Sequence, residues 1–126
     1  MKLDLDCIRD VLLTVEENTG YNKYMHINDM SNKYELLNKY DGDKVMYHII
    51  QSEKQKLIEV ENRDLSGNIW IGDLTPSGHK FIADIRDDNN WNKIKKTAQD
   101  VGSTSLDAIK QIAVNVISGI IASKFQ

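Results

Sequence analysis

The stretch that decides the fold runs from Asp41 to Gly78 and reads DGDKVMYHIIQSEKQKLIEVENRDLSGNIWIGDLTPSG. Its first part predicts a helix, because Val45 and Ile49 are spaced as one face of a helix and Asp41 or the next glycine can cap its start. KLIEVEN alternates in polarity and predicts a strand with one buried face, and IWIGDL returns as a second strand. The polar turn RDLSGN between them contains Ser-Gly-Asn, which suits the positive φ angles of a hairpin.

Three further elements are predicted before this stretch. An amphipathic helix runs from about Asp4 to Asn18, with the Asp4 carboxylate as its N-cap. The segment YMHIND, Tyr24 to Asp29, suits a short edge strand. A second helix is predicted over about Ser31 to Tyr40, and a short connection joins it to the helix that follows, as in a helix-turn-helix.

Three helices are predicted after the hairpin. Thr75 caps the first, and Pro76 takes its first helical position, where the missing amide hydrogen costs nothing. After a polar break at RDDNN the apolar pattern restarts at Trp91 and ends at a glycine. The last helix is rich in isoleucine, and Thr104 with Asp107 resembles the capping box at its start.

This order of elements predicts an α+β, mostly helical fold, namely a winged helix-turn-helix in which the hairpin is the wing. The chain, residues 1–126, is expected to be a single winged-helix-like domain, with the winged-helix core in 1–75 and a C-terminal helical extension in 76–126. The predicted core contains the following side chains: Leu12, Ile49, Leu57, Trp70, Phe81, Ile85 and Trp91.

The composition is that of an ordinary soluble domain, with 40% hydrophobic and 28% charged residues. The single cysteine, Cys7, cannot form an internal disulfide, and the acidic start MKLDLD is unlike a signal peptide, so a cytoplasmic location is expected. The most apolar segment, Leu106 to Ala122, contains Asp107 and Lys110, which are costly in a bilayer, so no membrane contact is expected.

The chain resembles one protein family over nearly its whole length. The resemblance rests on MKLDLDCIRDVLLTVEEN, on VMYHIIQSEKQKLIEV, on LTPSGHKFIADIRDDNNWNKIKK and on the final apolar helix. These segments are similar to domain of unknown function 2513, a family of small bacterial, phage and prophage proteins. The resemblance implies a fold like that of winged-helix proteins and a mobile-element setting, and it brings no established activity or catalytic residue.

The end of the third predicted helix departs from the family pattern. Family members typically have Ala-Gly there, whereas this chain has Gln55 and Lys56, and Ser52 stands where an apolar residue is usual. The departure predicts a helix end that is less sharply turned and less well packed.

No pattern of residues predicts catalysis, a metal site or a cofactor. His26, His48, His79 and Cys7 are scattered, without the close spacing that metal ligands need. The acidic pair Asp87-Asp88 is interpreted as a helix cap, because consecutive residues on a helix do not face each other. The sequence therefore favours a binding protein that is not an enzyme.

The first functional hypothesis is a DNA-binding transcriptional regulator of phage or mobile-element origin. A winged helix places its third helix in the major groove of double-stranded DNA and its wing over the backbone. The candidate DNA-binding residues are Lys44, Tyr47, His48, Gln51 and Lys54 on that helix and Arg63 on the wing. For His48 the alternative, a bond to a backbone carbonyl that fixes its helix, is equally open. The net charge of −3 counts against this hypothesis.

The alternative is a winged-helix module for protein–protein interaction or dimerisation that does not bind DNA. The acidic balance and the wide apolar stripe of the last helix support it. A homodimer through this helix is expected to use Ile109, Ile112, Val116 and Ile120, unless the stripe packs entirely onto the rest of the domain.

Overall fold

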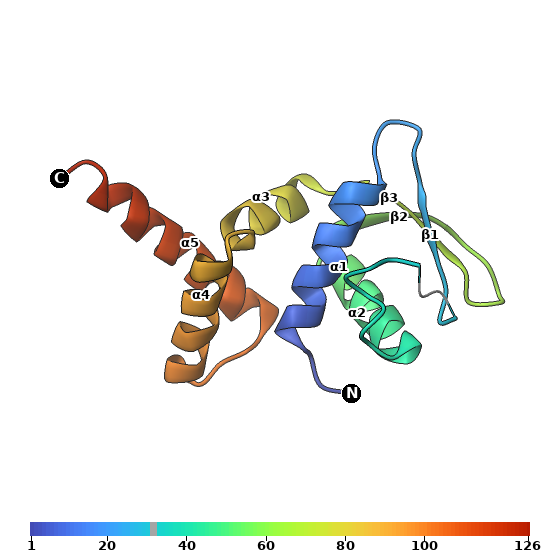
Figure 1. Ribbon diagram of the computed structural model, residues 1–126, viewed down its shortest axis with the longest axis horizontal. Coiled ribbons are helices and arrows are strands. Elements are labelled where there is room, and N and C mark those ends of the chain that lie inside the picture. The colour runs from blue at the N-terminus through green and yellow to red at the C-terminus, as the bar shows by residue number, and fades with distance from the viewer. Residues whose placement is uncertain (31–32) are drawn as a thin grey trace. The chain divides into compact units, whose positions relative to one another are not determined.

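The computed structural model describes residues 1–30 and 33–126. Over this part of the chain the fold is α+β and mostly helical, with five helices and a three-stranded antiparallel sheet (Figure 1). The elements are α1 (Leu5–Asn18), β1 (Met25–Ile27), α2 (Gly42–Lys54), β2 (Ile58–Arg63), β3 (Ile69–Leu74), α3 (Pro76–Ile85), α4 (Asp88–Val101) and α5 (Leu106–Ser123). They divide into two compact units, Met1–His79 and Lys80–Gln126.

Helix α1 provides the central helix of the first unit and begins where the sequence predicts. The Asp4 carboxylate accepts hydrogen bonds from the backbone amides of Asp6 and Cys7, at 3.0 and 3.2 Å. Ile8 and Leu12 are fully buried, and α1 packs against both α2 and β3. The apolar stripe of α1 therefore forms the core of this unit together with α2 and the sheet.

The sheet has the order β1-β3-β2, so the short strand β1 lies at an edge, as predicted. In β3 the residues Ile69 and Ile71 are buried, whereas Trp70 between them is half-buried. Its ring lies 4.9 Å from that of His26, which is paired with it in β1. The prediction that Trp70 is a core residue is wrong, because alternate residues of a strand point to opposite faces and Ile69 and Ile71 occupy the buried one.

The helix predicted over 31–40 is wrong for residues 33–40, which form hydrogen-bonded turns; Ser31 and Asn32 lie outside the described residues. The Tyr40 hydroxyl donates to the Asp10 carboxylate at 2.6 Å, the Tyr34 hydroxyl donates to the His26 carbonyl at 3.0 Å, and Leu37 is buried. The two tyrosine hydroxyls reach different elements, α1 and β1, and such tertiary contacts override a weak local helix preference.

Helix α2 ends in a sharp left-handed turn. Lys56 has a φ of 59°, and the amide of Leu57 donates to the carbonyl of Ser52 at 2.9 Å, a bond that closes a Schellman-type end. The prediction that this helix end is less sharply turned is therefore wrong. The chain makes a sharp turn with a lysine at the position where glycine is favoured. The Thr75 hydroxyl donates to the Lys56 carbonyl at 2.6 Å and accepts from Gly78, which ties the start of α3 to this turn.

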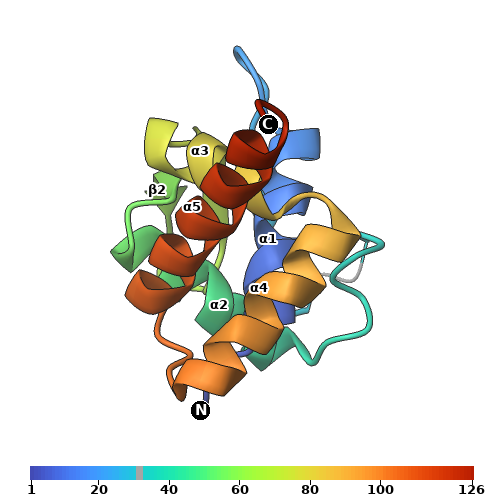
Figure 2. The same ribbon diagram turned by 90° about the vertical axis from the view of Figure 1, so that its left-hand side faces the viewer.

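The second unit contains most of α3 and the antiparallel pair α4 and α5, which pack side by side (Figure 2). Asp87 caps α4 by accepting from the amide of Asn90, and Gly102 ends it in the left-handed conformation. The cap of α5 is Ser105, one residue after the predicted Thr104, because the Ser105 hydroxyl accepts from the Ala108 amide at 3.1 Å.

The core prediction is confirmed for all its members except Trp70. The confirmed residues are at most 4% exposed: Leu12, Ile49, Leu57, Phe81, Ile85 and Trp91.

Substituting Lys56→Gly is expected to stabilise the protein. A non-glycine residue in the left-handed region costs roughly 1–2 kcal/mol, and the extra flexibility of glycine in the unfolded chain offsets part of the gain. We expect the free energy of unfolding, measured by urea denaturation, to rise by about 0.5–1 kcal/mol. Lys54→Gly is the matched control, since α2 includes Lys54 and glycine in a helix is unfavourable. A loss of stability with Lys56→Gly would contradict the proposed strain.

Candidate functional site

The predicted DNA-contacting residues of α2 share one side of the helix but differ in exposure. Lys44, Tyr47, Gln51 and Lys54 follow one another at spacings of three, four and three. The first three are partly covered, and Lys54 is exposed. This side of α2 therefore offers fewer open side chains than the pattern predicts.

Lys44 is engaged within the protein. Its ammonium lies 2.6 Å from the Asp4 carboxylate and 5.4 Å from the centre of the Tyr40 ring. The hydrogen bond to Asp4 raises the pKa of Lys44 above its ordinary value. Partial burial by itself would raise the pKa of Asp4, but Lys44 and the backbone amides at the start of α1 outweigh it, so that pKa lies below its ordinary value.

His48 is fully buried, so its candidacy as a DNA contact is wrong. Its Nε2 accepts from the amide of Asp4 at 2.8 Å, and its Nδ1 therefore carries the proton that it donates to the carbonyl of Lys44 at 2.7 Å. The imidazole links the start of α1 to α2. The alternative reading of His48, as a residue that fixes its helix through a backbone carbonyl, is confirmed.

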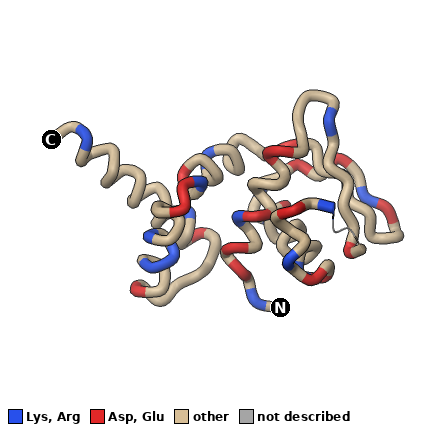
Figure 3. Tube along the Cα trace, in the orientation of Figure 1, with Lys and Arg blue, Asp and Glu red and all other residues tan. Residues whose placement is uncertain are grey.

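Arg63 on the hairpin is also paired. Its guanidinium forms an ion pair with the Glu53 carboxylate near the end of α2. The face formed by α2 and the hairpin is close to electrically neutral, since residues 43–66 hold four basic and five acidic side chains. Figure 3 shows the two signs interspersed there. Such a face attracts a phosphate backbone weakly.

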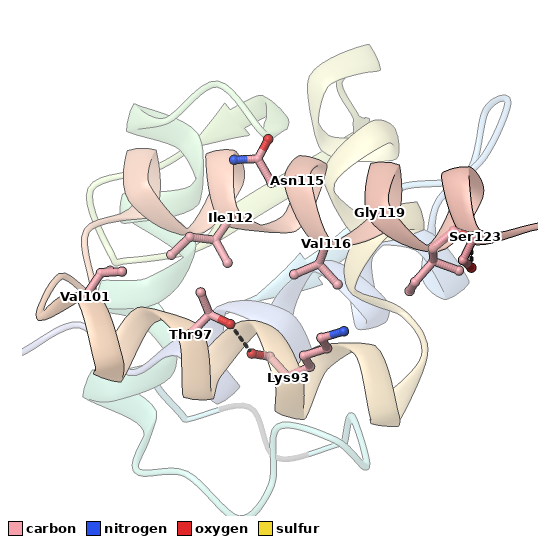
Figure 4. Close-up of a pocket in the computed structure, with 9 residues that line it drawn as sticks. Lys93, Thr97, Val101, Ile112, Asn115, Val116, Gly119 and Ser123 are labelled. Atoms are coloured by element: carbon pink, nitrogen blue, oxygen red, sulfur yellow. Dashed lines mark hydrogen bonds between the residues drawn. The ribbon is translucent and has the colours of Figure 1, made fainter. Parts of the chain in front are cut away.

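The predicted dimerisation stripe divides into a buried start and an open remainder. Ile109 is fully buried, so its candidacy as an interface residue is wrong: it is enclosed within the monomer. Ile112, Val116 and Ile120 are half-buried and line one side of a groove of about 620 Å³ between α4 and α5 (Figure 4). Thr97 and Val101 of α4, among others, line the other side.

Gly119 lines the groove and leaves its side of α5 open. Apart from its chain neighbours and the adjacent backbone of α5, no atom lies within 4 Å of the position that a side-chain carbon would occupy there. Beyond it, Ile121 and Phe125 are 53% and 86% exposed. Among the described residues α5 is the one helix long and apolar enough, by length and composition alone, to cross a membrane. The end of α5 and the residues after it thus carry apolar surface that the monomer does not cover.

The described residues hold no group of three or more His, Cys, Asp or Glu side chains placed to bind a metal. Cys7 is buried, and this burial raises the pKa of its thiol to about 12. The thiol is therefore protonated at neutral pH and a poor nucleophile.

Several residues at these surfaces were not singled out from the sequence. Glu53 and Asp4 neutralise two of the candidate cations, Arg63 and Lys44, but these partners are 10 and 40 residues away, and no sequence pattern links them. Met46 and Ile50 line a second groove, beside the hairpin. Asp43, Met46 and Ile50 are spaced by three and then four residues. This helical spacing could have identified the side of α2 that lines the groove.

Comparison with known proteins places the chain in a family. The sequence profile of the family described as Hypothetical protein (DUF2513) matches residues 2–105, and the chain belongs to this family, which confirms the resemblance. A curated relative, an uncharacterized protein of Haemophilus influenzae (strain ATCC 51907 / DSM 11121 / KW20 / Rd), is 31% identical over 125 residues, which cover 97% of this chain and 100% of the relative. No solved structure matches the chain significantly.

Asp4→Asn is expected to lower stability at neutral pH and not at acid pH. Asparagine keeps the N-cap but loses the charge that pairs with Lys44. Because the pKa of Asp4 is lower in the folded than in the unfolded state, its contribution to stability is present above the unfolded-state pKa and is lost as the pH falls through the folded-state pKa. At neutral pH the loss should be at most about 1 kcal/mol.

Urea denaturation of the wild type and the variant across this pH range provides the measurement. In a Lys44→Gln background the same substitution should have a smaller effect, which isolates the ion pair. A difference that stays constant from neutral to acid pH would show that the charge of Asp4 contributes nothing.

Proposed function

We propose that this chain is a protein-interaction module built on a winged-helix-like unit, and that it pairs with a second copy of itself through α4 and α5. The observation that carries the proposal is the open apolar surface of α5, where Ile112, Val116 and Ile120 line a groove that the monomer leaves unfilled. A contiguous apolar surface of this kind usually marks an interaction site.

A second copy suits this surface for a geometric reason. The α4–α5 pair is one layer of two antiparallel helices with a groove along it, and two such layers facing each other form a four-helix arrangement. Gly119 lets a partner helix approach closely, since its side of α5 is unobstructed. A bilayer suits it less, because Asp107, Lys110 and Asn115 lie on α5.

The winged-helix description of the first unit is part of this proposal. It is supported by the succession of α2, the β2–β3 hairpin and the edge strand β1 in one antiparallel sheet. The turns at residues 33–40, where a winged helix has a helix before its recognition helix, count against a strict version of it. A winged-helix unit can serve protein contacts as well as DNA contacts, since function depends on the surface and not on the fold.

A DNA-binding regulator is the second candidate, and one observation favours it. Tyr47, Gln51 and Lys54 lie on one side of α2 and retain exposed surface. The most specific test variant is Lys54→Glu, because a glutamate at position 44 would stand against the Asp4 carboxylate and lower the stability of the protein as well. Binding of a DNA duplex at low salt that Lys54→Glu removes would favour this candidate over the interaction module.

Gly119→Lys is expected to abolish self-association. The variant places a charged side chain in the groove, yet the monomer has room for it and lysine is a better helix former than glycine. Analytical ultracentrifugation should show the wild type as a concentration-dependent dimer and the variant as a monomer. Circular dichroism should show that the variant keeps its helical content.

The matched control is Gln111→Lys, which adds the same charge to α5 at an exposed position outside the groove. It should sediment like the wild type. A wild type that is monomeric at every concentration, or a Gly119→Lys variant that dimerises equally well, would refute the proposal.

A further inference from the structure

A second groove, of about 480 Å³, lies in the first unit between α2 and the β2–β3 hairpin. Met46 and Ile50, one turn apart on α2, are half-buried along it. Ile69 lies on the strand side, and Leu65 at the hairpin turn is fully exposed. Its lining therefore combines partly open apolar side chains from a helix with an apolar side chain on a turn.

The border of this groove is acidic. Asp43 precedes Met46 by three residues and shares its side of α2, and Asp64 lies on the hairpin turn. Arg63 also lines the groove, but it is ion-paired with Glu53. The charge available to a ligand at this border is therefore negative.

Asp64 is held in place before any ligand arrives. Its carboxylate accepts hydrogen bonds from the amides of Ser66 and Asn68 at 2.9 and 3.0 Å and from the Asn68 side chain at 2.9 Å. The bonds from Asn68 lower the pKa of Asp64, so it is ionised at neutral pH. Asn68 also accepts from His26 and Asn28 of the neighbouring segment, each at 2.9 Å. The hairpin turn is thus anchored to the edge of the sheet.

We propose that this groove binds a basic peptide segment of a partner protein, with apolar side chains of the segment against Met46, Ile50 and Leu65 and its Lys or Arg side chains facing Asp43 and Asp64. Charge complementarity selects this occupant, because the acidic border repels nucleic acid and attracts a cationic chain. Burial of the segment's apolar side chains against this lining adds a favourable hydrophobic contribution. A charge pair at the surface contributes little by itself.

This interaction is separate from the pairing of two copies through α4 and α5. The two grooves lie in different units of the chain and share no residue. Gly119→Lys should leave peptide binding unchanged, and substitutions at Asp43 and Asp64 should leave self-association unchanged. Failure of one proposal is therefore distinguishable from failure of the other.

The test begins with selection of a random-peptide library on the immobilised full chain. The enriched peptides should combine Lys or Arg with large apolar residues. A synthetic peptide of the enriched sequence is then titrated into isotopically labelled protein, and the backbone NMR shifts of Met46, Ile50 and Leu65 should change saturably. No enrichment, an acidic or uncharged consensus, or shifts elsewhere on the protein would overturn the proposal.

The decisive variant is Asp43→Asn with Asp64→Asn, which removes two charges. At position 64 asparagine keeps one acceptor oxygen for the amides of Ser66 and Asn68 and gives up the bond from the Asn68 side chain. The double variant should weaken peptide binding by about tenfold or more, and added salt should weaken wild-type binding in the same direction. The matched control, Asp100→Asn with Asp107→Asn, removes the same charge from the second unit and should bind as the wild type does. Equal affinity of both double variants would overturn the proposal. NMR shift changes at the groove when the protein is concentrated without peptide would also overturn the proposal, because they would identify a second copy of the chain as the occupant.

Discussion

The buried imidazole of His48 sets the relative position of α1 and α2. The rest of the first unit depends on this contact, because α1 also packs against β3. One ring nitrogen accepts from the Asp4 amide and the other donates to the Lys44 carbonyl, at 2.8 and 2.7 Å. A fully buried polar ring is stable when its hydrogen bonds are made, and losing one partner would leave an unsatisfied group in the core. Asp4 is at once the partner of His48, the cap of α1 and the counter-ion of Lys44.

The contact between α1 and α2 also limits what the surface of α2 can bind. Holding Lys44 against Asp4 stabilises the corner but removes a cation from the side that would face DNA, and the pairing of Arg63 with Glu53 has the same effect at the hairpin. Charges that complete a fold internally contribute little to the long-range field of the molecule. What remains beside α2 is the groove lined by Met46 and Ile50, whose border is acidic.

Local patterns predicted the elements that depend on local forces. The cap at Asp4, the Thr75-Pro76 start of α3 and the apolar stripes of α4 and α5 were readable because capping and amphipathicity are encoded within a few residues. Residues 33–40 were predicted wrongly, since their turns are held by the distant partners of Tyr34 and Tyr40. The burial of His48 and of Ile109 could not be predicted from the sequence either. A periodic pattern shows which residues share a side of a helix, but it does not show what packs against that side. The pairing of the candidate cations depends on tertiary contacts for the same reason.

Charge distinguishes the groove along α4 and α5 from the groove beside α2. Residues 1–79 hold nine basic and fourteen acidic side chains, a net charge of −5, whereas residues 80–126 hold seven basic and five acidic, a net charge of +2. Two copies meeting through α4 and α5 bring like charges together, so salt should strengthen that contact by screening the repulsion. A basic segment in the groove beside α2 meets opposite charge, so salt should weaken that contact. Because the two dependences have opposite signs, ionic strength alone separates pairing of the helical unit from capture of a cationic partner by the first unit.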